Sequence, residues 1–408
     1  MANIRHLGEI LTYRGRAARV RGMPTCPEWA RTLNLWTDRV MHADPYPRYA
    51  ELRASCPVAW SAEIGGHWLV TRHADIVRVL QDPDTFSAVT QVLPASVDLL
   101  GTRIPGEVDG PEHNRYRQAL LPMFAPRYVA ALEPTAQAIM ERLLADVDPA
   151  GFEFVSTVAI PYVFEMVMAL FGIEAEHHDA IRAWEDGGLR KTPHDPALTA
   201  QVGGFLGDLI SDRRAHEKAD PTDLLDHLAN ADLTLDECVR LAVFALKAGL
   251  HTTVNALGNC VAYLAAHPDV RDVLVAQPER VTEVLEELMR LESILVITRT
   301  ATNDTEVAGQ PITAGDHLLL LTGSAGRDEA VFADPDTFNT DRVNTAHLMF
   351  GSGPHRCLGR HFARSELRVA LEALHRLIPT YRLDPDRPPK RYTAMSRGAK
   401  QIHLVLEP

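Results

Sequence analysis

One long apolar segment constrains the fold more than any other feature of the sequence. Thr234-Leu-Asp-Glu237 has the pattern of a capping box, in which the Thr and Glu side chains satisfy free backbone N–H groups at the start of a helix. The helical pattern that follows continues to His267-Pro268, a length of roughly 50 Å at about 1.5 Å per residue. A helix so long and so apolar is expected to cross the body of the protein. Ala248-Gly249 interrupts the pattern near its middle and predicts a local distortion.

Weaker patterns on both sides of this helix predict a mainly helical protein with small β-sheets. From about residue 111 to residue 267, apolar residues recur at intervals of three and four, which indicates successive amphipathic helices, and the pattern returns over residues 358–377. Strand-like stretches are short and bounded by turns; they cover residues 57–61 and 66–71, parts of 298–350, and 401–406. No linker-like segment or internal repeat divides the chain, so we expect a single domain over residues 1–408.

Charge and cysteine content narrow the class of protein further. The formal net charge of -13 is unfavourable for binding nucleic acid, and no apolar run approaches the roughly 18–20 residues of a membrane helix. Residues 1–22 carry five arginines and one glutamate without the apolar stretch of a targeting peptide, so we expect a flexible basic terminus. Five widely spaced cysteines favour neither a disulfide scaffold nor a zinc site. We therefore expect a monomer of the reducing cytoplasm that binds neither nucleic acid nor membrane.

One of the five cysteines lies in a distinctive loop. The segment Phe350-Gly-Ser-Gly-Pro-His-Arg-Cys-Leu-Gly359 places two glycines and a proline before Cys357, and a helical pattern begins directly after it. Glycine and proline together form a tight, rigid turn. A thiolate at a helix N-terminus is stabilised by the helix dipole and by free backbone N–H groups, which also tune a metal-bound sulfur. For an isolated residue, a buried structural cysteine would be favoured; the fixed positions of the aromatic, glycine and histidine residues argue against it.

These residues match the haem-binding pattern of the cytochrome P450 family, Phe-Gly-x-Gly-x-His-x-Cys-x-Gly, without a gap. The chain resembles that family from about residue 40 to its end, and the resemblance implies the cytochrome P450 fold with its long central helix over haem b. It makes Cys357 the iron ligand, places Phe350 near the sulfur, and gives Gly359 the role of letting the next helix approach the porphyrin. Thiolate ligation donates electron density to iron and favours cleavage of the O–O bond.

The resemblance also assigns partners to the two haem propionates, which need cationic or hydrogen-bonding groups. His113 and Arg117 match the family's His-x-x-x-Arg pair, and Arg299 and His355 match the remaining contacts. Each alone would be interpreted as a surface cation, but four at matching positions favour cofactor binding.

A second family pattern is structural. Glu287 and Arg290 match the family's Glu-x-x-Arg helix and share one helix face, and Arg342 fits the later arginine that meets this pair. We expect these three residues to stabilise the fold and to take no part in catalysis.

The central helix departs from the family at one position. In Ala248-Gly-Leu-His251-Thr252-Thr253, Thr252 matches the hydroxyl that helps to hold and protonate oxygen, whereas His251 replaces the family's acid. An imidazole titrates near neutral pH and can both donate and accept hydrogen bonds. His251 relays protons by itself, or it relays them poorly so that peroxide serves better as oxidant, or it is structural and protons arrive by another route. The first of these alternatives is favoured.

The resemblance implies a substrate pocket with mostly aliphatic walls. The candidates are Val92, Leu93, Val97, Leu99, Leu100, residues 184–189, Phe244, Lys247, Ala248 and residues 294–297, which include Ile294 and Val296. Lys247 stands in an apolar run; it pairs with a substrate carboxylate, joins a proton path, or, as the favoured alternative, extends its stem to solvent. A pocket with few polar anchors fits terpenoid, steroid, fatty-acid-derived or aromatic substrates.

The resemblance predicts a haem-thiolate monooxygenase that hydroxylates or O-demethylates a small apolar molecule. Its electrons come from NAD(P)H through a separate ferredoxin or flavodoxin-like donor and a reductase. Arg356, Arg360 and Arg364 form a basic cluster on the side where donors dock in the family, although a solvated helix face explains them equally well. The replacement of the acid by His251 keeps two alternatives open, a peroxide-driven peroxygenase and a coupling or rearrangement enzyme. A non-catalytic haem-binding or sensing protein is a third, against which Thr252 and the basic cluster count.

Overall fold

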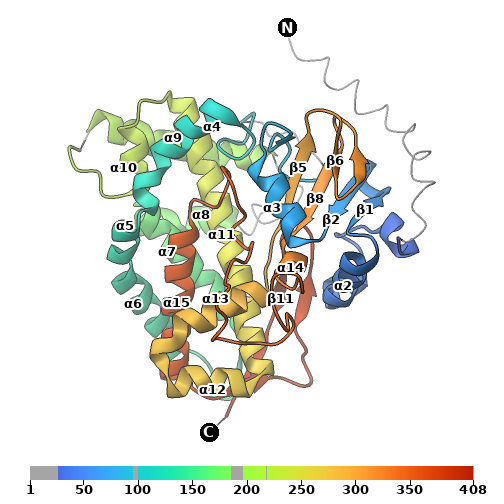
Figure 1. Ribbon diagram of the computed structural model, residues 1–408. Coiled ribbons are helices and arrows are strands. Elements are labelled where there is room, and N and C mark those ends of the chain that lie inside the picture. The colour runs from blue at the N-terminus through green and yellow to red at the C-terminus, as the bar shows by residue number, and fades with distance from the viewer. Residues whose placement is uncertain (1–25, 95–99, 185–195, 217, 408) are drawn as a thin grey trace.

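The computed structural model describes residues 26–94, 100–184, 196–216 and 218–407. Helices gather on one side of the molecule and the largest β-sheet lies on the other (Figure 1). This arrangement confirms the predicted fold class, a mainly helical protein with small sheets. Within these described ranges, no helix is long and apolar enough to cross a bilayer.

The long helix α11 (Leu235–Ala266) runs through the middle of the molecule, as predicted (Figure 1). Both halves of its capping box form: the Glu237 N–H donates to Thr234 Oγ1 at 3.2 Å, and the Thr234 N–H donates to Glu237 Oε2 at 2.7 Å. The predicted distortion at Ala248-Gly249 is wrong, because the helix is continuous over its 32 residues. Gly249 instead permits close packing, since a Cβ atom there would lie 3.1 Å from Val167 Cγ2.

The helices around α11 enclose the largest apolar core. α7 and α9 pack directly against α11, and α15 packs against α6, α11 and α13. Their bounds are α4 (Gly110–Leu120), α5 (Pro126–Ala131), α6 (Glu133–Ala145), α7 (Ile160–Phe171), α8 (His178–Trp184), α9 (Pro196–Ala215), α10 (Leu224–Ala229), α12 (Pro268–Ala276), α13 (Val281–Leu291) and α15 (Arg360–Leu377).

The largest sheet has five strands in the order β1-β2-β8-β5-β3. Strand β2 pairs with β8 in parallel, and the other neighbours are antiparallel. The strands are β1 (Val58–Ser61), β2 (His67–Val70), β3 (Phe86–Ser87), β5 (Val296–Ala301) and β8 (His317–Leu321). The β1–β2 hairpin confirms the strand pair predicted around the Gly65-Gly66 turn.

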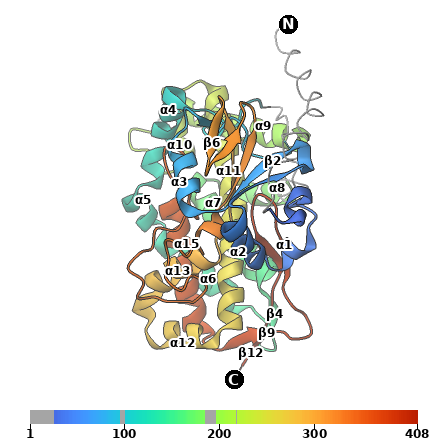
Figure 2. The ribbon, with the colours of Figure 1, turned by 45° about the vertical axis from the view of Figure 1, so that its right-hand side comes forward.

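Three smaller sheets, four short α-helices and several short 3-10 or π-helical segments complete the described chain. Figure 2 shows the sheet β4-β12-β9 at the end of the molecule where the C-terminus lies. The remaining bounds are β4 (Phe152–Glu153), β6 (Thr305–Val307), β7 (Gln310–Ile312), β9 (Tyr381–Leu383), β10 (Lys390–Tyr392), β11 (Gly398–Gln401), β12 (His403–Leu406), α1 (Arg39–Ala43), α2 (Tyr46–Ser55), α3 (His73–Gln81) and α14 (Thr322–Ala325).

The five-stranded sheet separates two smaller apolar clusters. Successive residues of a strand point to opposite faces, so Leu318 and Leu320 join one cluster while Leu319 and Leu321 join the other. The same alternation operates in β5, where Ile297 packs with the first cluster and Val296 with the second. The register of β5 therefore decides which of its residues can face the helical side of the molecule.

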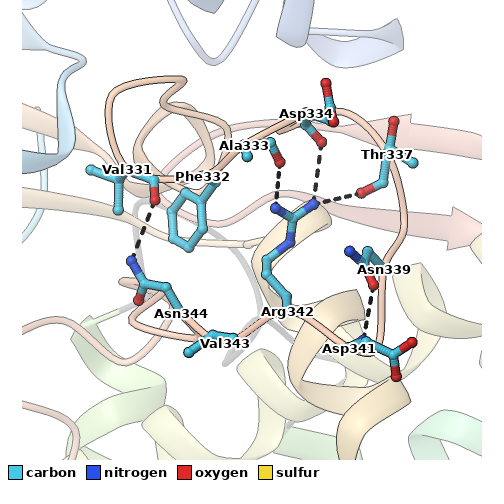
Figure 3. A pocket seen from close by; sticks show the side chains of 10 residues that line it. All are labelled: Val331, Phe332, Ala333, Asp334, Thr337, Asn339, Asp341, Arg342, Val343 and Asn344. Carbon is cyan, nitrogen blue, oxygen red and sulfur yellow. Dashed lines mark hydrogen bonds between the residues drawn. The ribbon is translucent and has the colours of Figure 1, made fainter.

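Glu287 on α13 joins two arginines in a buried network, as predicted. Arg290 Nε and Nη2 each lie 2.7 Å from a Glu287 carboxylate oxygen, and Arg342 Nε lies 3.2 Å from Glu287 Oε1. Figure 3 shows the Arg342 guanidinium reaching backbone carbonyl oxygens between residues 333 and 337 as well. Burial alone would raise the pKa of Glu287, but the hydrogen bonds from Arg290 and the neighbouring charges lower it.

The cysteines depart from the sequence prediction in one respect. Cys26 and Cys56 form a disulfide, with Cα atoms 5.0 Å apart, whereas the sequence predicted no such bond. The two residues are 30 positions apart and meet only because the segment before α1 folds back onto the end of α2. Cys238 and Cys260 are free and buried, as expected of small core residues.

Candidate active site

A cavity lies between α11 and the loop that carries Cys357. Its volume is about 370 Å³, within the range of about 300–1,000 Å³ that is usual for ligand pockets. Residues of α4, α7, α11 and α15, of segment 294–299 and of the cysteine loop form its wall. The cavity therefore brings together segments that are more than 200 residues apart in the sequence.

The cysteine loop is a tight turn that only glycine permits. Gly353 has φ +69°, and a Cβ atom there would lie 2.2 Å from the carbonyl oxygen of Leu80. The Cys357 N–H donates to the Phe350 carbonyl oxygen at 2.9 Å, which closes the turn. Helix α15 begins at Arg360, three residues after Cys357, so the thiol lies beside a helix N-terminus as predicted.

The surroundings of Cys357 act on its thiol in opposite directions. Desolvation raises the pKa of the thiol, while the Gly359 N–H and the guanidinium groups of Arg117 and Arg360 lower it. A metal cation bound to the sulfur would add a larger stabilising charge and hold the thiolate form. The sulfur lines the cavity and can therefore ligate a metal held there.

Two guanidinium groups at the cavity fit a cofactor that carries carboxylates. Arg299 is 4% exposed, and its hydrogen bond goes to the neighbouring Thr298 carbonyl oxygen at 2.8 Å. Desolvation lowers the pKa of Arg299 to about 10, and burial also lowers the pKa of Arg117. Neither residue forms an ion pair with a carboxylate of the described residues. The buried Arg299 and the half-buried Arg117 are cations partly removed from water, which favours a nearby anion. The two propionates of haem would supply one for each.

His113 and His355 pack against each other in the cavity wall. Their rings are 3.9 Å apart between centroids, and both line the cavity. Desolvation, together with the nearby His355 and Arg117, lowers the pKa of His113 to about 4, so its ring is neutral at pH 7. The four residues predicted as propionate contacts thus come together in one wall.

Asp109 is a neighbour of these residues that sequence reasoning missed. Its Oδ1 lies 2.8 Å from His355 Nε2, and its Oδ2 accepts hydrogen bonds from Ser87 Oγ at 2.5 Å and from the Ala88 N–H at 3.1 Å. Burial alone would raise the pKa of Asp109, but these bonds lower it. Asp109 thereby ties three separate segments together and leaves the Nδ1 atom of His355 for another partner.

The residues of α11 that were predicted to face bound oxygen or substrate line the cavity, except for His251 and Lys247. Phe244, Ala248 and Thr252 all line the cavity, and Thr252 Oγ1 donates to the Ala248 carbonyl oxygen at 2.9 Å. His251 is half-buried and does not belong to the described lining. His251 therefore lies beside Thr252 on α11 but outside the described cavity wall.

Glu366 on α15 is a second residue that the sequence analysis did not single out. It lines the cavity and is 1% exposed; its Oε2 accepts a hydrogen bond from Thr253 Oγ1 at 3.3 Å. Its Oε1 is buried without a hydrogen-bond partner among the described residues. Burial raises the pKa of Glu366 well above its ordinary value, which favours the protonated form of the group. An acid four residues after the buried Phe362, on the apolar face of α15, was the available signal.

The predicted pocket residues of segment 294–297 divide between two sides of the chain. Ile294, Leu295 and Ile297 line the cavity. Val296 does not: its side chain points to the opposite face of β5 and packs in the apolar cluster of α2, β2 and β8. The expectation for Val296 was wrong because strand alternation, which the irregular residues before β5 obscure in the sequence, turns it away.

Other pocket candidates lie elsewhere. Leu93 is buried in that same cluster, and Val92 is outside the lining. Leu100 packs against α9, and Trp184 against Phe205 of α9, with ring centroids 5.3 Å apart. Val97, Leu99 and residues 185–189 lie outside the described residues.

Lys247 is turned away from the cavity. Its Nζ donates to Thr199 Oγ1 of α9 at 2.8 Å, and together with Leu100 it lines a separate small pocket. Lys247 therefore connects α11 to α9, which differs from both a substrate contact in the main cavity and a stem that ends in solvent.

The basic cluster on the cysteine-loop side has unequal members. Arg356 is exposed, whereas Arg360 and Arg364 are half-buried. Arg364 forms a paired contact with Glu286, at 2.5 and 3.0 Å, and its guanidinium carbon lies 4.4 Å from the Phe350 ring centroid. The charge of Arg364 is thus compensated within the protein, and Arg356 is the residue of the cluster most accessible to a partner.

Comparison with known proteins assigns this chain to a family. The cytochrome P450 family model matches residues 197–404. Linalool 8-monooxygenase of Pseudomonas putida is 30% identical over 92% of this chain and 98% of its own length. Erythromycin C-12 hydroxylase of Saccharopolyspora erythraea is 36% identical over 76% of this chain and 81% of its own. Among solved structures, CYP101J2 superimposes with a TM-score of 0.85 and 25% identity, covering 94% of this chain and 98% of that chain.

These similarities extend far beyond the cysteine loop and agree with the fold and the cavity described above. The first of these two relatives is named as a monooxygenase and the second as a hydroxylase. The chain therefore belongs to the cytochrome P450 family and is an oxidoreductase of the monooxygenase type with haem as its cofactor.

Proposed function

We propose that this enzyme inserts one oxygen atom of O2 into a small, largely apolar molecule by hydroxylation or O-demethylation. The observation that carries the proposal is that Cys357 and Thr252, from different elements, line one cavity whose remaining wall is mostly apolar. Bound haem supplies the oxygen chemistry, and ligation by a thiolate favours O–O cleavage.

The chain's own residues hold the cofactor from two directions. Cys357 ligates the iron through its sulfur. The buried Arg299 and the half-buried Arg117 bind the propionates, and His113 and His355 contribute ring nitrogens to the same wall. A desolvated cation without an anion is an uncompensated charge, which a propionate would neutralise, and this supports propionate binding by these residues.

Apolar side chains orient the substrate and exclude water. Phe244 and Ala248 of α11 and Ile294, Leu295 and Ile297 contribute to the lining. The exclusion of water lowers the local dielectric constant and thereby strengthens the hydrogen bonds made inside this space. The wall selects molecules by shape and apolar surface, which agrees with the name of the relative that acts on linalool, a small and largely apolar alcohol.

Thr252 and Glu366 accept and donate protons at the cavity wall. The Thr252 hydroxyl hydrogen points to the Ala248 carbonyl oxygen, so Thr252 Oγ1 can accept a hydrogen bond from the cavity and, after rotation, donate one. Glu366, whose pKa is raised by burial, holds a proton within the same wall. His251, beside Thr252, relays protons toward it from the half-buried side of α11.

Electrons reach the enzyme from NAD(P)H through a separate ferredoxin or flavodoxin-like protein and its reductase. Arg356, exposed beside Cys357, and the half-buried Arg360 offer such an acidic donor a positive surface near the iron ligand. Replacing Arg356 by Glu should slow reduction by the donor and leave substrate affinity unchanged.

A peroxide-driven reaction is the second candidate, and His251 at the family's acid position is the observation that favours it. In this case hydrogen peroxide supplies the oxygen atom, the oxidising equivalents and the protons of the water that is formed. The reaction therefore needs neither an electron donor nor protons delivered from solvent. Product formation with ferredoxin, reductase and NAD(P)H, compared with product formation with hydrogen peroxide alone, separates the two reactions.

The ligation of the iron has its own test. The purified holoenzyme is reduced under carbon monoxide and its Soret band recorded; thiolate ligation by Cys357 gives the long-wavelength band that is the hallmark of the family. Cys357→His should move the band to the shorter wavelength of histidine-ligated haem. Cys260→Ala, at a buried cysteine outside the cavity, should leave it unchanged. A short-wavelength band in the unaltered enzyme would contradict the proposal.

A further inference from the structure

Gln91 is a polar side chain of the cavity wall that neither the cofactor nor the proton path uses. Most polar groups of the lining are already assigned: five to haem, and Thr252, Thr253 and Glu366 to protons. Ser352 accepts a hydrogen bond from Gln81 Nε2 at 3.3 Å. The Gln91 side-chain amide makes no hydrogen bond within the described part of the chain, although it is half-buried.

Gly106 creates the space that the Gln91 amide occupies. A Cβ atom at Gly106 would lie 2.2 Å from Gln91 Nε2 and 2.6 Å from Gln91 Oε1, so any other residue would displace the amide. Gly106 and the adjacent Pro105 also line the cavity. The amide therefore rests on a bare stretch of backbone at the cavity wall.

Three contacts fix the segment that carries Gln91. The Ala88 N–H donates to Asp109 Oδ2 at 3.1 Å, and the Gln91 N–H donates to Glu107 Oε1 at 3.4 Å. Glu107 is held in turn by Arg103, whose Nη1 lies 2.7 Å from Glu107 Oε1. Gln91 is thus presented to the cavity by a braced backbone, which lowers the entropic cost of using its amide for recognition.

The chemistry of the amide determines what it can recognise. A primary amide offers two N–H donors and a carbonyl acceptor, and it carries no charge. It pairs well with a hydroxyl, a ketone or an ether oxygen, and it does not compensate the charge of a carboxylate. The side chains that the wall offers to substrate are otherwise apolar, as Phe244, Ala248, Leu295 and Ile297 illustrate.

We propose that Gln91 determines substrate specificity by hydrogen bonding to a single neutral oxygen function on an otherwise apolar substrate. The inference rests on the proposed monooxygenase function and names the substrate class: oxygenated hydrocarbons, such as terpenoid alcohols and ketones, rather than pure hydrocarbons or fatty acids. The hydrogen bond sets which end of the substrate is anchored, and hence which carbon faces the oxygen side of the cavity.

Binding of matched ligand pairs tests this role. The oxidised holoenzyme is titrated by calorimetry, without electron donor, with linalool and its deoxy analogue citronellene, and with camphor and its deoxy analogue bornane. Hydrophobic transfer contributes equally to wild type and variant, so the change in the affinity ratio within a pair isolates the hydrogen bond. Gln91→Leu should lower the preference for the oxygenated member by about 3- to 10-fold.

A second variant displaces the same amide by changing the residue it packs against. Gly106 has no positive φ, so Gly106→Ala displaces the Gln91 amide without backbone strain. It should lower the preference as Gln91→Leu does, and it should have little further effect when combined with Gln91→Ala. Gln137→Leu, an exposed glutamine on α6, is the matched control and should leave the ratio unchanged.

The outcomes separate the inference from its basis. An affinity ratio that Gln91→Leu leaves unchanged in both pairs, or oxygenated members that do not bind at all, would overturn the role of Gln91. Faster loss of haem from Gln91→Leu at an unchanged ratio would also overturn it, because the amide would then serve a propionate. Altered ratios in an enzyme that forms no product with either oxidant would instead contradict the proposed function alone.

Discussion

The carboxyl group of Glu366 and the hydroxyl group of Thr253 lie 3.3 Å apart and join α15 to α11 inside the cavity wall. Glu366 has no cationic partner among the described residues, and its second oxygen makes no hydrogen bond there. Burial of a carboxyl without a cationic partner favours its protonated form. Glu366 can therefore hold a proton next to the predicted site of oxygen chemistry.

The pH dependence of stability should reveal that proton. The pKa of Glu366 is raised in the folded protein, so the folded state binds the proton more tightly than the unfolded chain does. This contribution is fully present below the ordinary pKa of about 4.5 and is lost as the pH rises toward the folded value. In Glu366→Gln, urea unfolding midpoints should fall less between pH 5 and pH 9 than in wild type, given roughly 1.4 kcal/mol per pKa unit.

The control for this prediction is Glu279→Gln, an exposed glutamate whose replacement should preserve the wild-type pH dependence. If Glu366→Gln and wild type lose stability in parallel over the same pH range, Glu366 is ionised in the folded protein and cannot store a proton for the reaction.

Arg299 should affect the protein with and without haem in opposite directions. The guanidinium is 4% exposed and has no ion-pair partner among the described residues, so in the apoprotein it is a desolvated charge that these residues leave without compensation. Arg299→Leu should therefore leave the free energy of unfolding of the apoprotein unchanged or raise it by about 1 kcal/mol. The same variant should lose haem to apomyoglobin roughly ten- to a hundredfold faster, because a charge-assisted hydrogen bond contributes about 1.5–3 kcal/mol.

Arg78→Leu, at an exposed position on α3, serves as the matched substitution and should alter neither measurement. Equal haem loss in Arg299→Leu and wild type would mean that Arg299 does not bind a propionate, whatever happens to the apoprotein.

Glu287 should be among the residues on which the fold depends most. It is 3% exposed and accepts hydrogen bonds from Arg290 and Arg342. Removing one partner of a buried ion pair leaves uncompensated charge, at a cost of about 3–5 kcal/mol. Glu287→Ala should lower the free energy of unfolding of the holoenzyme by about this amount, measured by denaturant titration. Glu283→Ala, exposed on the same helix, should change it by less than about 0.5 kcal/mol.

The sequence predicted those parts of the site that depend on local patterns. Cys357 lies in a turn whose glycines and proline are contiguous in the sequence and are followed directly by a helix. A segment of ten residues therefore determines the geometry of this turn. The capping box of α11 is equally local, and the structure contains it as predicted. His113 and Arg117, one helical turn apart, needed only the helix that carries them.

Features created by tertiary contacts were beyond that reasoning. Asp109 meets His355 across 246 positions, and Glu366 meets Thr253 across 113, so neither contact has a sequence spacing to show it. Cys26 and Cys56 pair for the same reason. Val296 was misplaced by a smaller error: a shift of one residue in strand register exchanges the two faces of the chain.

His251 is the remaining residue on which the choice of oxidant depends. It adjoins Thr252 in α11 and is half-buried, whereas Glu366 lines the cavity from α15. A relay from solvent needs a group that both gains and releases a proton near neutral pH, as imidazole does. His251 on the half-buried side of α11 and Glu366 in the cavity wall would therefore act in series.

Replacing His251 by Gln should uncouple oxygen consumption from product formation. Glutamine keeps hydrogen bonds but cannot titrate, so the product formed per NAD(P)H consumed should fall several-fold, with substrate affinity unchanged; positioned acid–base groups contribute about 10²- to 10⁴-fold in favourable cases. Peroxide-driven turnover should change far less, because that oxidant supplies its own protons. His267→Gln, exposed beyond the end of α11, is the control. Wild-type coupling in His251→Gln would assign His251 a structural role and give proton delivery to Glu366 and Thr252 alone.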